Sequence, residues 1–284
     1  MVMRALIAFL VAAVLWAAPP ARIVSTAPSI TETLYALGLG PRVVAVTAYC
    51  RYPPEAARKP KIGNFLNPNL EVILGLRPDL VIIHRNPTGL AGRLQNMGLK
   101  TLEVDQQTMA DVFTSMHAIG AAAGVPEAAR AVEKAIRAQL EEVRRKTAKL
   151  PRPRTMFLAG RTPGAIEGMV AAGGGSYHHE LIEIAGGKNI FESVTGAYPR
   201  VSLEEVLSRD PEVIIDMGEM SDPAGVTEER KRAVVALWRK YPVLSAVRNG
   251  RVYAVASDIF VVPGPRMVEA ARAFAAMIHP EAGF

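Results

Sequence analysis

The side chains best suited to bind a metal ion are histidines and a carboxylate that lie far apart along the chain. His84 ends an apolar run, His178 and His179 are adjacent, and Asp258 lies near the C-terminus. Imidazole and carboxylate groups are typical ligands of zinc and manganese. Because neighbouring helical residues point about 100° apart, only one of His178 and His179 can face a given ion. The sequence therefore offers His84, His178 and Asp258 as one candidate metal site, and haem iron bound by Tyr49 or a histidine as another.

Motifs of catalysis are missing from the sequence. It contains no Gly-x-Ser-x-Gly elbow and no phosphate-binding Gly-Lys-Ser/Thr, and "GGGSYHH" at 173–179 lacks the glycine spacing of a dinucleotide loop. A thiol dyad of Cys50 with His84 is conceivable, but nothing in the sequence brings the two together. We therefore predict that the protein is not an enzyme. A metal-handling enzyme or chaperone stays open as an alternative of a different class.

Length and composition set the broad class of protein. The 284 residues suffice for two domains, and 50% are hydrophobic and 21% charged, as in a folded globular protein. The net charge is +6, but the basic residues are scattered, with no run longer than "RRK" at 144–146. We therefore expect no nucleic-acid partner. The single cysteine excludes an internal disulfide, so both domains must be stable through core packing.

The N-terminus has the pattern of an export signal. One positive charge, Arg4, precedes an apolar run of 14 residues at 5–18. This run is shorter than the roughly 20 residues that a membrane-spanning helix needs. We therefore predict a secretory signal peptide at 1–21 and a periplasmic location, with a retained membrane anchor as the alternative. No cysteine follows the run, so it is not a lipoprotein signal.

Strand and helix patterns alternate along the rest of the chain, which favours parallel sheets flanked by helices. One segment differs from this pattern. Residues 126–150 form a charged helix with a single apolar stripe, bounded by Pro126 and Pro151. About 25 residues at 1.5 Å each would span the width of a small domain. We therefore predict an α/β fold of two Rossmann-like lobes, at 22–125 and 151–284, connected by this long helix.

A repeat relates the two predicted lobes. The segment "LEVILGLRPDLVI" at 70–82 aligns without a gap to "LEEVLSRDPEVII" at 203–215, and each matched pair is 133 residues apart. The alignment pairs Glu71 with Glu204, each near the start of a predicted helix. A weaker similarity relates 32–40 to 180–188, where each predicted helix starts with a glutamate and closes on glycine. Two glutamates at equivalent places would form a symmetric acidic pair, which suits a partner that is itself a two-fold dimer.

Taken together, these segments resemble the periplasmic substrate-binding proteins of ABC importers for cobalamin and iron–siderophore complexes. The resemblance covers nearly everything after the signal peptide. It rests on the order and spacing of "IVSTAPSITETLYALG", "YCRYPPEA", "NPNLEVILGLRPDLVI", "SYHHELIEIAGGKNIF", "YPRVSLEEVL" and "SDIFVVPGPR". It implies a monomeric receptor with its ligand held between two lobes. It also implies that Glu71 and Glu204 bind arginines of a permease dimer in the inner membrane.

The resemblance also implies a set of ligand-binding residues. These are Tyr49, Phe65, His84, Tyr198, Asp258 and Arg266, and we add Arg85 as a candidate for recognising anionic groups. Arg161 and Arg200 are further candidates for recognising anionic groups. Several relatives carry tryptophan at such positions, whereas only Trp238 follows the signal here. The cargo is thus predicted to be cobalamin or another corrinoid, or a ferric siderophore, with haem and free zinc or manganese as alternatives. No cofactor of the protein's own is expected.

Overall fold

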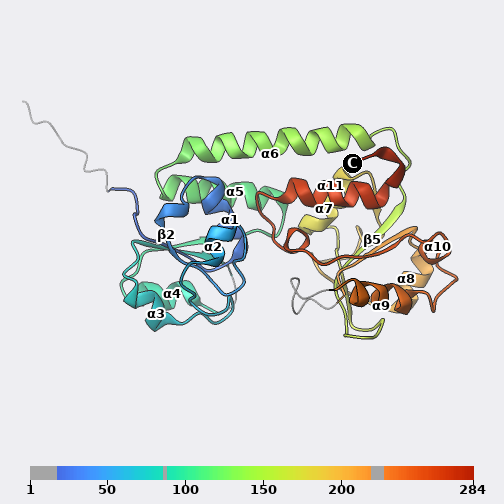
Figure 1. The fold of residues 1–284 in the computed structure, drawn as a ribbon, viewed down its shortest axis with the longest axis horizontal. Helices are drawn as coiled ribbons and strands as arrows, with labels where there is room; N and C mark the ends of the chain where they lie inside the picture. The colour runs from blue at the N-terminus through green and yellow to red at the C-terminus, as the bar shows by residue number, and fades with distance from the viewer. Residues whose placement is uncertain (1–17, 86–87, 219–226) are drawn as a thin grey trace, which may run out of the picture.

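The computed structural model describes residues 18–85, 88–218 and 227–284. Most of the predicted signal peptide, residues 1–17, lies outside the described residues. Within the described ranges, no helix is both long and apolar enough to cross a bilayer. Two α/β lobes lie side by side beneath one long helix, α6 (Pro126–Thr147), which runs across both of them (Figure 1). The predicted two-lobed α/β architecture is therefore confirmed. The helix begins at the expected residue and ends three residues earlier than the predicted 150.

The N-terminal lobe is built on a four-stranded parallel sheet in the order β2-β1-β3-β4. Its strands are β1 (Ile23–Ser25), β2 (Val43–Ala45), β3 (Leu80–His84) and β4 (Thr101–Val104). Its helices are α1 (Pro28–Ala36), α2 (Pro54–Ala57), α3 (Leu70–Gly75), α4 (Leu90–Asn96) and α5 (Met109–Ala122), with a 3₁₀ turn at Gly40–Arg42. The inner strand β3 reads as a continuous apolar run because both faces of a parallel sheet are covered.

The C-terminal lobe contains a mixed sheet in the order β10-β9-β5-β6-β8, with β7 also paired to β5. Its strands are β5 (Arg154–Gly160), β6 (Met169–Ala171), β7 (Lys188–Asn189), β8 (Arg200–Val201), β9 (Val213–Asp216) and β10 (Val252–Ala254). Its helices are α7 (Tyr177–Ile184), α8 (Leu203–Arg209), α9 (Glu228–Trp238), α10 (Ser245–Arg248) and α11 (Met267–Ile278), with 3₁₀ turns at Asp258–Phe260 and Pro280–Ala282. Strands β6 and β8 are antiparallel to their neighbours, and the sequence pattern did not predict them.

One predicted helix is too long. The pattern predicts a helix over 229–244, whereas α9 ends at Trp238. Pro242 explains the early end, because a proline disfavours the helical conformation of the residue before it.

The two lobes share one hydrophobic core. A single apolar cluster extends from Ile30 and Leu34 in α1, through Phe113 in α5 and Ile136 in α6, to Phe274 in α11. Two further clusters lie within the individual lobes. Buried apolar surface of this kind is the main stabilising term in a folded protein, so the connection between the lobes is packed rather than a loose tether.

The repeat found in the sequence is also a repeat of conformation. Asn69 and Ser202, 133 residues apart, cap α3 and α8 by accepting a backbone N–H with their side chains. Arg77 and Asp210, again 133 apart, are the non-glycine residues with positive φ among those described, at 46° and 42°. A left-handed conformation costs an L-residue about 1–2 kcal/mol, so its recurrence at matched positions shows that both units turn out of the helix at the same point.

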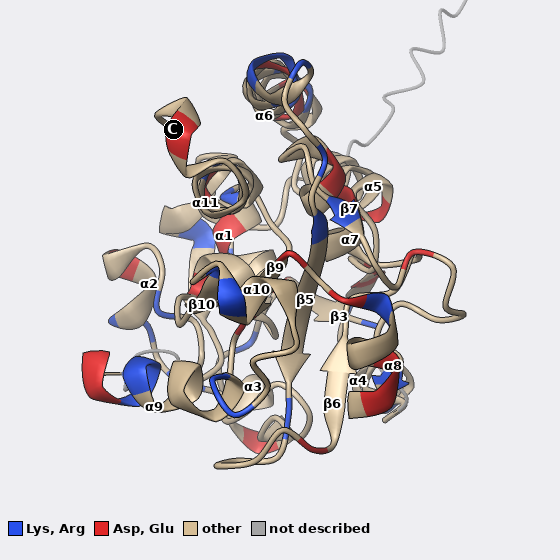
Figure 2. Ribbon diagram, turned by 90° about the vertical axis from the view of Figure 1, so that its right-hand side faces the viewer, with Lys and Arg blue, Asp and Glu red and all other residues tan. Residues whose placement is uncertain are grey.

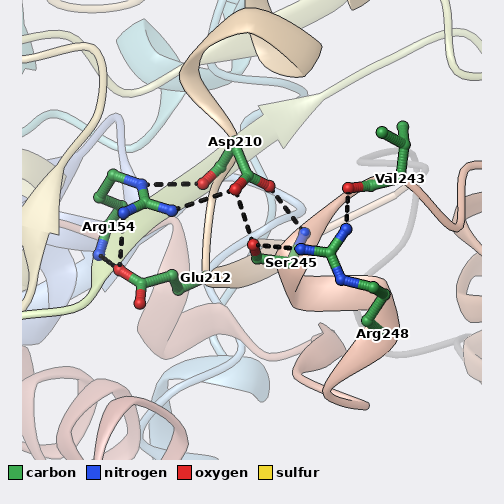
Figure 3. A network of polar contacts seen from close by, with 6 residues as sticks. All are labelled: Arg154, Asp210, Glu212, Val243, Ser245 and Arg248. Carbon is green, nitrogen blue, oxygen red and sulfur yellow. Dashed lines mark hydrogen bonds and ion pairs between the residues drawn. The ribbon is translucent and has the colours of Figure 1, made fainter.

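The repeated units are anchored alike. Arg22 Nε donates to the carbonyl oxygen of Arg77, and Arg154 Nε donates to that of Asp210. Figure 3 shows the C-terminal version, in which Arg154 also contacts Glu212. The Asp210 carboxylate there accepts hydrogen bonds from the backbone and hydroxyl of Ser245. In each unit, an arginine therefore holds the turn that follows the helix. Arg22 lies just before β1, and Arg154 is the first residue of β5.

Candidate ligand-binding cleft

A cavity of 1190 Å³ is lined by residues of both lobes. The N-terminal lobe lines it with His84 and Arg85 at the end of β3 and with residues 105–107 after β4. The C-terminal lobe contributes residues 159–162 at the end of β5, together with Tyr198. The carboxyl ends of three parallel-paired strands therefore face this cavity, which is where α/β proteins place ligand-binding groups.

A second cavity of 340 Å³ adjoins the first, because His84, Val261 and Pro263 line both. Tyr49, Phe65 and Asp258 line it as well. Tyr49 is 52% exposed, and the ring of Phe65 meets the imidazole of His84 edge to face at 5.8 Å. The cleft thus gathers six of the seven predicted ligand residues: Tyr49, Phe65, His84, Arg85, Tyr198 and Asp258.

Arg266, the seventh, lines neither cavity. Its guanidinium binds both carboxylate oxygens of the buried Glu32, with Nε at 2.9 Å from one of them. It also lies over the ring of Tyr52, 4.0 Å from the ring centre. Arg266 belongs to the C-terminal lobe and Glu32 to the N-terminal lobe. Its observed role is therefore to connect the lobes, and the correct partner was not evident because 234 residues separate the two.

A second contact crosses between the lobes. The carboxylate of Glu180 in α7 accepts the backbone N–H of Met109, the first residue of α5. The dipole at a helix N-terminus favours a negative charge there. Partial burial nevertheless raises the pKa of Glu180 above its ordinary value, because desolvation outweighs that hydrogen bond. Burial likewise raises the pKa of Glu32 despite its ion pair with Arg266.

His178 and Tyr198 form one polar unit in the wall of the main cavity. His178 Nε2 donates to the carbonyl oxygen of Phe260 at 2.5 Å, so its Nδ1 accepts the hydroxyl of Tyr198 at 2.8 Å. The ring of Phe157 stacks on the imidazole at 4.3 Å. Burial lowers the pKa of His178 from 6.5 to about 4 and raises that of Tyr198. Both groups are therefore neutral at pH 7.

This arrangement does not support the candidate metal site. Both ring nitrogens of His178 already have partners. In the described part of the chain, no group of three or more His, Cys, Asp or Glu side chains is placed to hold a metal ion. His84, His178 and Asp258 are consequently not assembled as a ligand set. His179 instead lines a smaller cavity beneath α6.

Three arginines line the main cavity, and two of them have carboxylate partners. Arg161 Nε donates to the fully buried Asp216 at 3.0 Å. The same carboxylate oxygen of Asp216 accepts the indole N–H of Trp238 at 2.7 Å. Arg85 lies 3.7 Å from Asp105 in an exposed ion pair. The third, Arg200, is exposed. Most of the positive charge in the wall is thus balanced by the protein itself.

Glu71 and Glu204 are exposed, and each is the second residue of its helix. Helices α3 and α8 both lie on the side of the molecule away from α6 (Figure 1). Figure 2 shows the acidic first turn of α8, which includes Glu205, and basic residues spread over separate elements. A groove of 630 Å³ borders that first turn.

The segment 105–107 lines the main cavity, although the sequence reading did not include it. Gln106 and Gln107 follow directly after β4. The signal was present, because "DQQ" directly follows the strand-like segment "TLEV" at 101–104, and α/β proteins place ligand-binding groups after the ends of strands.

The chain belongs to the periplasmic binding protein family, whose model matches residues 23–259. The vitamin B12-binding protein of Vibrio cholerae is 31% identical over 255 residues, covering 89% of this chain and 87% of that protein. An uncharacterized ABC transporter substrate-binding lipoprotein of Bacillus subtilis is 28% identical over 269 residues, covering 92% and 81%. Members of this family are transport components rather than enzymes, and they deliver their ligand to a membrane permease. The family implies a periplasmic or extracellular location.

Solved structures agree with the fold. The crystal structure of the periplasmic vitamin B12 binding protein BtuF of Vibrio cholerae matches with a TM-score of 0.75 and 28% identity, covering 94% of this chain and 99% of that one. The apo periplasmic heme-binding protein RhuT of Roseiflexus matches with a TM-score of 0.76 at 24% identity, covering 92% and 98%. The second likeness, at this level of identity, concerns the fold alone.

Proposed function

We propose that this protein captures cobalamin or another corrinoid between its two lobes and delivers it to an ABC permease. The observation that carries the proposal is the size of the interlobe cavity. Its 1190 Å³ exceeds the roughly 300–1,000 Å³ that encloses an ordinary small ligand. A free zinc or manganese ion would need a small cluster of ligating side chains instead, and none is formed among the described residues.

The charge balance of the cavity favours a neutral or weakly charged cargo over a polyanion. Two of its three arginines already pair with Asp216 and Asp105. A ferric siderophore with several negative charges, or the two propionates of haem, would compete with those carboxylates. Haem iron would also require a ligand. The candidate Tyr49 lines the adjoining cavity of 340 Å³ rather than the main one, and the hydroxyl of Tyr198 is bonded to His178. Burial raises the pKa of Tyr198, which disfavours the phenolate that binds iron.

Delivery would use Glu71 and Glu204, one on each lobe. We infer that they bind arginines of a two-fold permease dimer in the inner membrane, with the receptor docking as a monomer. The equivalent positions of the two glutamates, on the side away from α6, support this geometry. The segment 1–21 would direct export to the periplasm, followed either by cleavage or by retention as an anchor.

The cargo is tested by isothermal titration calorimetry of the purified protein with cyanocobalamin, haemin, a panel of ferric siderophores and zinc. We expect tight 1:1 binding of the corrinoid. Tight binding of haemin or a siderophore with no heat from the corrinoid would contradict the proposal. Tight binding of zinc alone, lost in His84→Ala, would identify a metal receptor instead.

A further inference from the structure

Gln106 is buried in the wall of the main cavity with both polar atoms of its carboxamide unpaired. The residue is 3% exposed and lines the cavity at the carboxyl end of β4. Neither Nε2 nor Oε1 has a hydrogen-bond partner in the described ranges. Other buried side-chain atoms there lack a partner too, including the hydroxyls of Tyr35 and Tyr177, but those residues do not line the cavity.

An unpaired buried amide is unfavourable for the folded protein. A donor or acceptor that loses water without gaining a partner destabilises the fold, and such groups are rare enough to call for an explanation. The backbone around Gln106 is otherwise well held. Its N–H donates to Asp105, and the next carbonyl, of Gln107, accepts the N–H of Tyr177 from the other lobe. The side chain alone is therefore unsatisfied, and turning it toward a bound molecule would break no hydrogen bond.

The chemistry of the side chain defines what would satisfy it. A carboxamide presents one donor face and one acceptor face side by side. A ligand carboxylate could only accept, which would leave Oε1 facing an anion. A primary amide offers the complementary pair and forms two antiparallel N–H···O bonds. Arg161 and Arg85 line the same cavity but already have carboxylate partners, so they do not compete with Gln106 for a ligand amide.

We propose that Gln106 recognises a peripheral primary amide of the cargo through paired hydrogen bonds. This inference rests on the proposed function, since a corrin ring carries acetamide and propionamide groups at its edge, whereas haem carries carboxylates. Gln106 thereby distinguishes amide-bearing corrinoids from macrocycles whose edge bears acids.

The test compares Gln106→Met, which keeps similar volume without the amide, with the wild-type protein. Affinities are measured by calorimetry for cyanocobalamin and for its monocarboxylic acids, in which a single propionamide is hydrolysed. The unfolding temperature of the protein without added ligand is measured in parallel. Gln95→Met is the matched control, because the carboxamide of Gln95 is exposed on α4 and donates to Thr101, outside both cavities.

We expect Gln106→Met to bind cyanocobalamin about tenfold more weakly, equivalent to about 1.4 kcal/mol. It should also lose the preference for the amide over at least one monocarboxylic acid. Without ligand, its unfolding temperature should stay equal or rise, because an unsatisfied group has been removed.

Unchanged corrinoid affinity in Gln106→Met would overturn the inference while leaving the proposed function intact. A lowered unfolding temperature with unchanged preference would also overturn it, since the amide would then be paired through buried water. Absence of corrinoid binding by the wild-type protein would overturn the proposed function first, and with it the amide-bearing class of cargo.

Discussion

Glu32 and Glu180 occupy matching positions in the two lobes, and each carboxylate bonds to the start of a helix in the opposite lobe. Glu32 binds Arg266, the N-cap residue of α11, and Glu180 accepts the N–H of Met109 at the start of α5. Gly38 and Gly186, six residues after each glutamate, adopt similar positive φ angles of 74° and 78°. The lobes are therefore linked by a reciprocal pair of contacts in addition to α6.

The effects of substituting Glu32 and Arg266 on the free energy of unfolding should be strongly non-additive. Glu32→Leu leaves the mostly buried guanidinium of Arg266 without its carboxylate, and Arg266→Met leaves Glu32 unpaired. Each change should destabilise the protein by roughly 3–5 kcal/mol. The double variant should lose clearly less than the sum, because it leaves no unpaired charge. Urea unfolding of the four proteins measures this, and additive losses would show that the two side chains act independently.

Charge reversal should separate binding from delivery. We expect Glu71→Arg with Glu204→Arg to lower cargo uptake at least tenfold in cells that depend on this receptor, with cargo affinity unchanged. The physical reason is repulsion between like charges at the permease surface. Glu141→Arg with Glu142→Arg reverses the same number of charges on the outer face of α6 and should transport normally. Undiminished uptake by the first double variant would remove Glu71 and Glu204 from the docking surface.

Acidic pH should destabilise the fold through His178. Its pKa is lowered to about 4 by burial, whereas the unfolded chain takes up the proton near 6.5. Below pH 6.5 the unfolded chain binds a proton that folded His178 does not. The free energy of unfolding is therefore highest above pH 6.5 and falls as the pH is lowered toward 4. By pH 5 the loss should be about 2 kcal/mol, at 1.36 kcal/mol per pH unit. Urea unfolding at pH 7 and pH 5 measures the loss.

His178→Leu should show a shallower dependence on pH over that window, whatever its absolute stability. A nuclear magnetic resonance titration of His178 with a midpoint near 6.5 would contradict the neutral, buried imidazole.

Two matched substitutions should have opposite effects. Arg77→Gly relieves a left-handed conformation at an exposed residue, and should leave stability unchanged or raise it by up to about 1 kcal/mol. Asp210→Gly relieves a similar φ but removes the hydrogen bonds to Ser245 and the ion pair with Arg154. It should destabilise the protein by about 1–3 kcal/mol. Thermal unfolding measures both, and changes of the same sign would mean that backbone conformation dominates at both sites.

Much of the fold follows from local patterns in the sequence. The repeat that pairs 70–82 with 203–215 predicted two equivalent helix–strand units, and the structure reproduces their caps and turns. The capping side chains Asn69 and Ser202 precede apolar runs and so mark helix starts directly. The start of α6 is marked differently, by Pro126 at the first helical position. The assignment of the leader and the bounds of the two lobes stay predictions.

The pairings inside the cleft could not be predicted in this way. Tyr198 lies two residues before β8, and β6 and β8 are too short to leave a pattern, so its hydrogen bond to His178 in α7 could not be anticipated. Arg266 was expected to bind the ligand. The sequence around an arginine does not show whether its guanidinium binds a ligand or a carboxylate that is distant in the chain. Such contacts depend on how elements pack, not on their own periodicity.

The chain of contacts from Arg161 through Asp216 to Trp238 links the cavity wall to a buried chromophore. Trp238 is fully buried, and its indole N–H shares a carboxylate oxygen with an arginine that faces the cleft. Any molecule that attracts Arg161 alters the electric field along that N–H. Trp16 lies in the predicted signal peptide, so Trp238 is the one tryptophan of residues 22–284, and we expect its emission to shift when a ligand draws Arg161 away from Asp216.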